Sequence, residues 1–270
     1  MLSKTIDFAT YSSLKIGGKN EVMILQTHDF SAQNLDLTLD SIHSFSIIGH
    51  AYNLLVSPKA SNLVMLDKTF DYIYDCEDCI EIGAMTPSGK IYRFFKENDL
   101  FGLEFLKALP GSAGGLTKMN AGMKQYEIKD IMLSACVNGK WRDDIKLSYR
   151  NSNIQGIISA IRVRKIKGFR HHLIAEFNAM RRTHPKLPSC GSCFKNPPNH
   201  YAGKLLEEAG LRGFVYGNVA LSQEHANFLV NLGDGSFDEA VELIALAQQK
   251  VFTLFGIWLE PEVKIIKEKI

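Results

Sequence analysis

Residues 188–198, Pro-Ser-Cys-Gly-Ser-Cys-Phe-Lys-Asn-Pro-Pro, form the densest group of chemically useful side chains in the sequence. Prolines at both ends predict an irregular, non-helical backbone, because proline fixes φ and has no N–H to donate. Gly191 allows a tight turn that directs the hydroxyl of Ser192 outward, and Lys195 and Asn196 add a cation and an amide. A loop of this kind is a candidate site of catalysis.

Cys190 and Cys193 form a C-x-x-C pair in this loop, and Cys76 and Cys79 form another. Zinc ribbons place two such pairs roughly 15–20 residues apart, so the much larger separation here disfavours a zinc site, and we predict no metal. A redox dithiol at Cys190 and Cys193 is an alternative, but the strand-free context expected there is not that of a thioredoxin-like motif. With Cys136 the cysteine count is odd, which favours a reducing compartment over a disulfide framework.

The composition of the chain is that of an ordinary soluble globular protein. Its 270 residues are enough for two or three small domains, and its formal net charge is +2. The near-neutral charge gives no reason to expect a nucleic-acid or membrane partner. The N-terminus lacks an apolar signal region and no stretch approaches the length of a membrane span, so we expect a cytoplasmic protein.

Hydrophobic periodicity predicts an α+β protein in which helices and strands do not alternate regularly. We predict strands at 21–26, 46–56, 62–66, 79–84, 131–137, 145–149, 158–166, 226–231 and 258–266, and helices at 87–98, 172–183, 202–210 and 236–255. The last helix begins with capping-box spacing, Ser236-Phe-Asp-Glu239. Because the connectivity is not alternating, a doubly wound nucleotide-binding fold is not expected.

The segment 109–116, Leu-Pro-Gly-Ser-Ala-Gly-Gly-Leu, is rich in glycine and is followed by Met-Asn-Ala-Gly-Met at 119–123. Glycine lets backbone N–H groups approach an anion closely, so this segment is a candidate nest for phosphate oxygens. It is neither a Walker A loop nor a G-x-G-x-x-G fingerprint, and a tight turn at a packed sheet corner is the alternative. A predicted strand–turn–strand at 47–56 favours the phosphate interpretation, because two backbone loops would then face one diphosphate.

In their order along the chain, these segments resemble the UDP-N-acetylenolpyruvoylglucosamine reductases of bacterial peptidoglycan synthesis, the MurB family. The resemblance spans nearly the whole chain. The short distance from Arg150 to Ser192 is similar to that of the compact subclass, which lacks a tyrosine-bearing insertion. The matching residues are Ile16-Gly17-Gly18, Gly49 with Asn53-Leu54-Leu55, Pro110-Gly111 with Gly114-Gly115, Asn120-Ala121-Gly122, Tyr149-Arg150-Asn151-Ser152, Gly191-Ser192 with Phe194-Lys195-Asn196-Pro197, Ala202-Gly203-Lys204-Leu205, His225-Ala226-Asn227-Phe228 and Leu259-Glu260-Pro261-Glu262-Val263.

The resemblance implies an FAD-binding fold of the vanillyl-alcohol-oxidase type. FAD-binding subdomains are expected at 1–67 and 68–167, and a C-terminal α+β substrate domain at 168–270, whose last strand carries a catalytic glutamate. The resemblance also implies a monomer that binds FAD, NADPH and a UDP-sugar. Hydride would pass from NADPH through the flavin to UDP-N-acetylglucosamine enolpyruvate, giving UDP-N-acetylmuramate.

Adding hydride to the enolpyruvyl double bond builds negative charge on the α-carbon and its carboxylate, which requires fixed donors and then a proton. By motif position, Arg150 would bind the carboxylate, Ser192 would deliver the proton, and Glu262 would stay protonated and donate a hydrogen bond to the enolate-like intermediate. Without the resemblance, these residues would be interpreted as a salt-bridge partner, a turn residue and a surface residue of an edge strand, respectively.

The resemblance also assigns binding residues. The FAD-binding residues are Gly49, Asn53, Leu54, Pro110, Gly111, Ser112, Gly114, Gly115, Asn120, Ala121 and Gly122, and the substrate-binding residues are Tyr149, Lys195, Asn196 and His184. The Arg-x-x-Lys-x-Pro element of relatives appears here as Arg-Arg-Thr-His-Pro at 181–185. His184 or Lys186 would therefore take the place of the lysine that holds the UDP diphosphate.

Where relatives commonly show Gly-Gly-Gly-Ser-Asn, this chain has Gly-His-Ala-Tyr-Asn at 49–53. His50 and Tyr52 must therefore contact the cofactor differently or point away from it. One alternative function is that of another FAD-dependent oxidoreductase of the same fold, for which His50 would be the residue to check for covalent flavin attachment. A catalytically silent nucleotide-sugar or flavin-binding protein is a second alternative, and the intact catalytic set argues against it.

Overall fold

The computed structural model describes residues 2–30 and 45–268 of the chain. The chain divides into two compact units, and each unit is built from segments that are not consecutive in the sequence. Unit 1 comprises 1–4, 22–50 and 62–181, and unit 2 comprises 5–21, 51–61 and 182–270. This division does not follow the boundaries expected at 67 and 167, and the three-domain scheme stays a prediction. Within the described ranges, no helix combines the length and the apolar character needed to cross a membrane.

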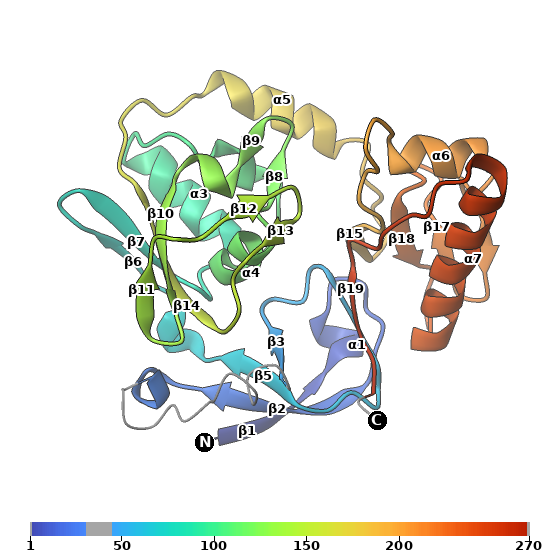
Figure 1. Cartoon of the computed structure of the whole chain (residues 1–270), viewed down its shortest axis with the longest axis horizontal. Helices are drawn as coiled ribbons and strands as arrows, with labels where there is room; N and C mark the ends of the chain where they lie inside the picture. The colour runs from blue at the N-terminus through green and yellow to red at the C-terminus, as the bar shows by residue number, and fades with distance from the viewer. Residues whose placement is uncertain (1, 31–44, 269–270) are drawn as a thin grey trace. The chain divides into compact units, whose positions relative to one another are not determined.

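The elements confirm a mixed α and β fold (Figure 1). Strands β1 (Leu2–Asp7) and β2 (Lys19–Leu25) each begin in one unit and end in the other. Unit 1 contains η1 (Thr27–Phe30), β3 (Ser46–Ile48), β5 (Leu63–Leu66), η2 (Lys68–Phe70), β6 (Ile73–Asp75), β7 (Cys79–Gly83), α3 (Ser88–Glu97), η3 (Glu104–Lys107), α4 (Ala113–Lys118), β8 (Gly122–Met123), β9 (Tyr126–Glu127), η4 (Ile128–Asp130), β10 (Met132–Val137), β11 (Lys140–Arg142), β12 (Leu147–Ser148), β13 (Asn151–Ser152), β14 (Ile158–Arg164) and α5 (His172–Arg181). Unit 2 contains α1 (Phe8–Tyr11), β4 (Leu54–Val56), β15 (Ser189–Ser192), α6 (Ala202–Glu208), β16 (Val215–Tyr216), β17 (Val219–Leu221), β18 (Phe228–Asn231), α7 (Phe237–Phe255) and β19 (Lys264–Ile266).

Unit 1 is built on a five-stranded sheet in the order β11-β10-β14-β7-β6, in which all neighbours are antiparallel. Ile80, Ile82 and Val163 are fully buried in it, which accounts for the strong apolar signal of β7 and β14. Helix α4 packs against both of these strands. The sheet is therefore the support on which the glycine-rich segment rests.

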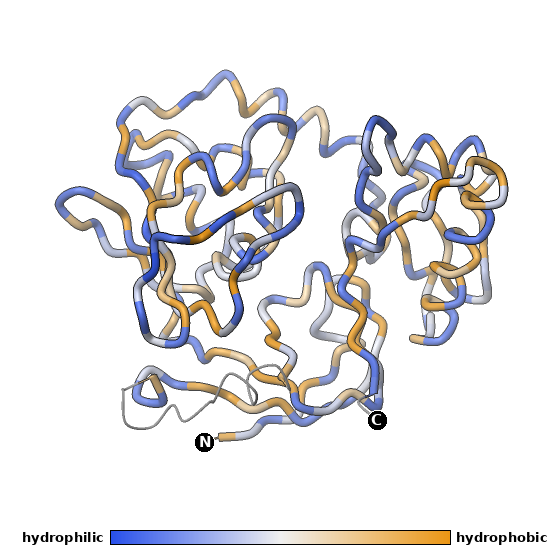
Figure 2. The backbone as a smooth tube through the Cα atoms, in the orientation of Figure 1, coloured by the Kyte–Doolittle hydropathy of each residue, from blue (hydrophilic) through white to orange (hydrophobic). Residues whose placement is uncertain are grey.

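Unit 2 contains a four-stranded sheet in the order β15-β18-β17-β16, and α7 packs against β17 and α6. The capping box predicted for α7 is confirmed, because the Ser236 hydroxyl accepts from the Glu239 N–H at 3.1 Å and the Glu239 carboxylate accepts from the Ser236 N–H at 2.7 Å. Hydrophobic and hydrophilic residues alternate along α7 with helical spacing (Figure 2). The buried face consists of Ala240, Leu243, Ile244, Ala247 and Val251.

Three predicted elements differ from those observed. The stretch 46–56 is two strands that pair in different sheets, β3 with β5 in unit 1 and β4 with β19 in unit 2. The last predicted strand is extended only at Lys264–Ile266, where β4 provides its partner. The glycine-rich segment, expected to be a loop, forms helix α4 from Ala113 because Gly114 fits against Ala84, where a Cβ would lie only 3.0 Å from the Ala84 Cβ.

A buried ion pair in unit 1 predicts how stability depends on pH. Glu104 is 1% exposed and binds the Arg170 guanidinium at 2.9 and 3.0 Å. Burial alone would raise the pKa of Glu104, but hydrogen bonds from Arg170 and from backbone N–H groups outweigh it, so the pKa is lowered. The stability that the Glu104–Arg170 pair contributes is therefore fully present above the unfolded pKa of about 4.3. It is lost as the pH falls through the lowered pKa that Glu104 has in the folded protein.

We expect Glu104→Gln to lower the free energy of unfolding at pH 7 by about 3 kcal/mol, because it leaves the Arg170 charge without its carboxylate. The difference from the parent should shrink as the pH falls below about 4.3, because the unfolded carboxylate then takes up a proton while the folded one stays ionised down to its lowered pKa. Urea unfolding at pH 7 and pH 3 measures both values. Glu97→Gln, at an exposed position of α3, is the control and should change stability by less than about 0.5 kcal/mol. An equal effect of Glu104→Gln at both pH values would contradict this account.

Candidate active site

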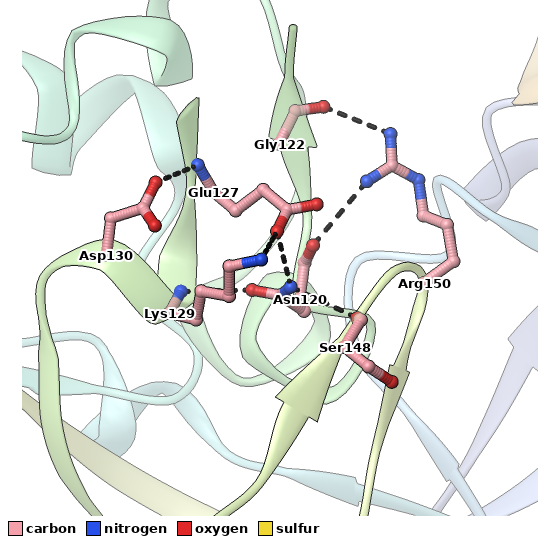
Figure 3. Close-up of polar contacts among 7 residues, drawn as sticks. All are labelled: Asn120, Gly122, Glu127, Lys129, Asp130, Ser148 and Arg150. Carbon is pink, nitrogen blue, oxygen red and sulfur yellow. Dashed lines mark hydrogen bonds and ion pairs between the residues drawn. The ribbon is translucent and has the colours of Figure 1, made fainter. Parts of the chain in front are cut away.

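Arg150 lies in the turn of a short hairpin in unit 1. Ser148 pairs with Asn151, so Tyr149 and Arg150 join β12 to β13. Arg150 has φ of +51°, an uncommon conformation for a residue with a long side chain. Its guanidinium donates to the carbonyl of Gly122 at 3.1 Å and to that of Asn120 at 3.5 Å, as Figure 3 shows. The predicted carboxylate-binding group is thus bonded to the backbone of the predicted FAD segment.

Asn120 connects this segment to the hairpin. It is fully buried, has φ of +44°, and donates through Nδ2 to Glu127 Oε2 at 3.0 Å and to the carbonyl of Ser148 at 3.1 Å. Its Oδ1 accepts from the N–H of Lys129 at 3.0 Å (Figure 3). Nδ2 therefore joins the segment after α4 to the strand that precedes Arg150, and Oδ1 joins it to η4. This network leaves the Arg150 turn little freedom to move.

Gly49 and His50, from the first of the two loops predicted to face a diphosphate, contact the glycine-rich segment within unit 1, whereas Asn53 and Leu54 of that loop belong to unit 2. A Cβ at Gly49 would lie 2.7 Å from the hydroxyl oxygen of Ser112, so a larger residue at 49 would require the Ser112 side chain to move. His50, at the position where relatives commonly carry glycine, hydrogen-bonds the backbone of Gly111. Burial lowers the pKa of His50, although the Gly111 contact and the carboxylate of Asp71 oppose this, so the imidazole is neutral at pH 7. The His50 side chain therefore points toward the glycine-rich segment and links the two loops.

Two backbone N–H groups of the glycine-rich segment already donate hydrogen bonds within the protein. The N–H groups of Ala113 and Gly114 donate to the carbonyls of Thr86 and Ala84, each at 2.9 Å. Thr117, further along α4, has a fully buried hydroxyl for which the described residues supply no hydrogen-bond partner. Buried polar atoms are nearly always bonded, so an orphaned hydroxyl in the cofactor segment fits the binding of a polar group there.

Ser192 lies at the end of β15 in unit 2. An irregular backbone was expected throughout 188–198, but residues 189–192 form a strand. They do so because β18, which is distant in sequence, supplies a pairing partner. Ser189 pairs with Val230 and Ser192 with Phe228, so the register shifts by one residue between them. Gly191, at φ of +77°, accommodates the extra residue as a β-bulge. The bulge redirects the chain just before Ser192, and the strand also overturns the strand-free context expected for the cysteine pair.

Glu262 lies beside the residues that follow Ser192. Its N–H donates to the carbonyl of Cys193 at 2.8 Å, and Phe194 and Pro261 form an isolated antiparallel bridge. Lys195 donates through its N–H to the Glu260 carbonyl at 2.9 Å and pairs with the Glu260 carboxylate at 2.5 Å. The segments 192–195 and 260–262 therefore run side by side, which brings two of the three predicted catalytic residues together.

Asn53, predicted to bind FAD, holds the backbone of Glu262 from the other side. Its Nδ2 donates to the carbonyl of Glu262 at 2.9 Å, and its own carbonyl accepts from Lys264 at 3.0 Å. Leu54 then pairs with Lys264 in the parallel β4–β19 ladder. The backbone of Glu262 is thus bonded through both its N–H and its C=O. This role of Asn53 was not predicted, because the two residues are far apart in sequence.

The other predicted substrate-binding residues have mixed surroundings. Tyr149 is 45% exposed, and its ring lies beneath the Arg150 guanidinium at 5.1 Å. Asn196 accepts from the N–H of Ala202 at 3.0 Å and so caps the start of α6. The ring of His184 lies 4.8 Å from that of Phe228, the first residue of β18.

Burial makes the cysteines near Ser192 poor nucleophiles. Cys190 and Cys193 are 2% and 0% exposed, and burial raises the pKa of Cys190 to about 12 and that of Cys193 well above its ordinary value. Both are therefore thiols at neutral pH, which disfavours the dithiol alternative. All five cysteines are free. In the described part of the chain, no group of three or more His, Cys, Asp or Glu side chains is arranged to hold a metal ion.

Comparison with known proteins shows the family of the chain. The family model described as UDP-N-acetylenolpyruvoylglucosamine reductase, C-terminal domain, matches residues 183–266. The reductases of that name from Helicobacter hepaticus and Helicobacter pylori are 51% and 48% identical to the chain, in each case over 99% of this chain and 100% of the relative. That from Campylobacter jejuni is 40% identical over 97% of this chain and 99% of its own length.

The crystal structure of UDP-N-acetylenolpyruvylglucosamine reductase (MurB) from Thermus caldophilus has the same fold. It superimposes with a TM-score of 0.82 at 27% identity and covers 99% of this chain and 100% of that one. These similarities define the protein as an enzyme of the oxidoreductase class. The chain belongs to the UDP-N-acetylenolpyruvoylglucosamine reductase (MurB) family, as the ordered motifs predicted.

Proposed function

We propose that the protein catalyses the NADPH-dependent, FAD-mediated reduction of UDP-N-acetylglucosamine enolpyruvate to UDP-N-acetylmuramate, in cytoplasmic peptidoglycan synthesis. The observation that carries the proposal is 51% identity over the full length of a reductase of this family, in a chain that has Arg150, Ser192 and Glu262 at the motif positions. We further propose the FAD-binding fold of the vanillyl-alcohol-oxidase type. The monomeric state and the compact subclass stay predictions.

The residues of unit 1 fit an FAD pyrophosphate. The close approach of Gly49 to Ser112, the His50 contact with Gly111 and the orphaned hydroxyl of Thr117 support binding there. When bound, FAD would supply a carrier that accepts hydride from NADPH and gives it up to the substrate. His50 would hold the loops together without adding charge, because its imidazole is neutral at pH 7.

Arg150 would bind the substrate carboxylate. Its two contacts to backbone carbonyls hold the guanidinium in place, and a guanidinium carries five N–H donors in a planar fork. A planar fork matches the two oxygens of a carboxylate, which gains charge as hydride arrives at the β-carbon. A donor held in place before the reaction stabilises that charge without reorganisation.

Ser192 would give the proton that completes the reaction at the α-carbon. Its hydroxyl is a weak acid, so it can act only on a strongly basic carbanion or enolate and only from a fixed position. The Gly191 bulge and the ladder pair with Phe228 supply such a position. Glu262, in its protonated form, would donate a hydrogen bond to the substrate carboxylate during this step.

We expect Glu262→Gln to lose less activity than Glu262→Ala, because an amide N–H can still donate where a methyl group cannot. The measurement is the rate at which substrate reoxidises the reduced flavin, in single turnover. Glu260→Gln, which removes the exposed partner of Lys195, is the control and should stay near the parent rate. Equal losses in the two Glu262 variants would exclude hydrogen-bond donation by this residue.

The proposed function is tested by the flavin spectrum of the purified protein. NADPH should bleach the visible absorbance of the bound flavin, and the enolpyruvyl UDP-sugar should restore it in the absence of oxygen. Acid precipitation should leave the flavin in the supernatant, because His50 is placed against Gly111 as a loop contact. Bleaching without restoration would reject the proposed substrate, and flavin retained in the pellet would favour another oxidoreductase of the same fold.

A further inference from the structure

Asn227 grips the backbone directly after Ser192 and Cys193. It is 4% exposed, and its side-chain amide makes two hydrogen bonds to a single residue. Its Oδ1 accepts from the N–H of Phe194 at 2.9 Å, and its Nδ2 donates to the carbonyl of Phe194 at 2.8 Å. Phe194 is 1% exposed. Without Asn227, its backbone N–H and C=O would lose these hydrogen bonds in a buried position, which costs free energy.

The backbone of Asn227 extends the same contact. Its carbonyl accepts from the N–H of Cys193 at 2.6 Å, and its N–H donates to Nδ1 of His225 at 3.2 Å. Burial lowers the pKa of His225, and although Glu207 opposes this, the imidazole is neutral at pH 7 and can accept. The backbone of Asn227 is therefore itself held by hydrogen bonds to Cys193 and His225.

The regular β15–β18 ladder ends at the pair formed by Ser192 and Phe228. Beyond it, the Asn227 side chain provides the two hydrogen bonds that a further strand residue would have provided. The carbonyl of Cys193, in the stretch that Asn227 holds, is also the acceptor for the Glu262 N–H. A shift of 193–194 would therefore move the hydroxyl of Ser192 and the backbone of Glu262 together.

We propose that Asn227 is a positioning residue for proton delivery, which keeps Ser192 and Glu262 in a fixed relation through its clamp on residues 193–194. The inference rests on the proposed function, in which these two side chains act on the substrate. Asn227 itself touches neither reacting atom in this account. Loss of the clamp therefore slows the step that needs the proton and leaves hydride transfer from NADPH unchanged.

The chain offers a matched control in Asn231, at the other end of β18. It is also 4% exposed, and its side chain also bonds only to backbone groups. Its Nδ2 donates to the carbonyls of Leu14 and Lys15 at 3.2 and 3.0 Å, and its Oδ1 accepts from the N–H groups of Gly233 and Gly235, each at 3.0 Å. A purely structural role for buried asparagine amides would make the two residues equivalent.

The first test compares Asn227→Ser with Asn231→Ser in the flavin-loaded protein. We expect both to lower the melting temperature to a similar extent. Stopped-flow reoxidation of reduced flavin by the enolpyruvyl UDP-sugar should slow by about 100-fold in Asn227→Ser only, because small displacements of catalytic groups have effects of that order. Reduction by NADPH should stay within about twofold of the parent in both, because that step needs no proton from Ser192.

The second test uses Asn227→Asp, in which the new carboxyl group mimics the amide only when it is protonated. The ionised carboxylate cannot donate to the Phe194 carbonyl, whereas the protonated group can donate to it and accept from the Phe194 N–H. The ratio of variant to parent reoxidation rates should therefore rise as the pH falls. The titratable and charged groups near this position are His225, on which Glu207 and Arg212 act, together with Cys193 and Glu262. All are present in both proteins, so the ratio removes their own effect on the rate.

The possible outcomes distinguish a failure of the positioning role of Asn227 from a failure of the proposed function. An active parent with equal kinetics in the Asn227 and Asn231 variants would overturn the positioning role and leave the proposed function intact. A ratio independent of pH in Asn227→Asp would likewise overturn it, because lost packing alone does not recover on protonation. A parent whose reduced flavin is not reoxidised by this substrate would overturn both.

Discussion

Ser192→Ala should leave the reduction of bound flavin by NADPH near the parent rate and slow reoxidation by substrate about 100-fold to 10,000-fold. The effect is confined to one half of the reaction because only the enolpyruvyl carbon needs a proton after hydride arrives. The β-bulge at Gly191 places the Ser192 hydroxyl without help from its own side-chain packing, so the alanine variant should fold normally. Stopped-flow absorbance of the flavin measures both halves separately.

Ser189→Ala is the matched control for this prediction. Ser189 lies in the same strand and pairs with Val230, and its carbonyl, which the substitution keeps, accepts from the Ser13 hydroxyl at 2.7 Å. We expect this variant to behave as the parent in both halves. Ser192→Cys should recover part of the lost rate, because a thiol can also give a proton. A fall in the NADPH half alone would assign Ser192 to nicotinamide binding, and parent-like rates in both halves would refute its role as donor.

Elements with local signals could be predicted from the sequence. Helix α7 begins directly after Ser236 because the capping box and the apolar spacing are both encoded within a few residues. Helices α3 and α5 were likewise predicted to within two residues at each end. Their runs of helix-forming residues are local signals that do not depend on distant partners.

Elements that depend on distant partners could not be predicted in the same way. Strand β15 contains Gly191 and follows Pro188, and both residues are typical of loops, yet β18 pairs with it. The helix at Ala113–Lys118 contains two glycines, which lower helix propensity, but the carbonyls of Ala84 and Thr86 bind its first amides. In each case tertiary hydrogen bonds outweigh the local preference.

The same distinction applies to the candidate site. The motif order identified the family, because each motif is a short run of neighbouring residues, and it predicted roles for Arg150, Ser192 and Glu262. It assigned no role to Asn227, and it assigned Asn53 to the cofactor only. Asn53 bonds Glu262 across 209 positions of sequence, and Asn227 bonds Phe194 across 33. Such contacts have no local signature, so they emerge only when the chain is folded.

Arg150→Lys should lower the rate of flavin reoxidation by substrate about 100-fold to 1,000-fold, although the charge is kept. The guanidinium reaches the carbonyls of Asn120 and Gly122 with two separate nitrogens, and its planar fork of N–H donors matches the two oxygens of a carboxylate. A lysine ammonium is a single point of donation, so it must abandon either the backbone contacts or the two-point contact with substrate. The positive φ of the turn is the same for both residues, so backbone strain does not change.

The control is Arg142→Lys on β11, where the guanidinium pairs with the exposed carboxylate of Asp144. An exposed pair contributes little, so this variant should react as the parent does. In Arg150→Lys, reduction by NADPH should stay near the parent rate while the KM for the enolpyruvyl substrate rises and its turnover falls. A loss within a few-fold would show that Arg150 supplies only charge. An equal loss in the NADPH half would show that its bonds to Asn120 and Gly122 serve the cofactor segment, and that another group binds the carboxylate.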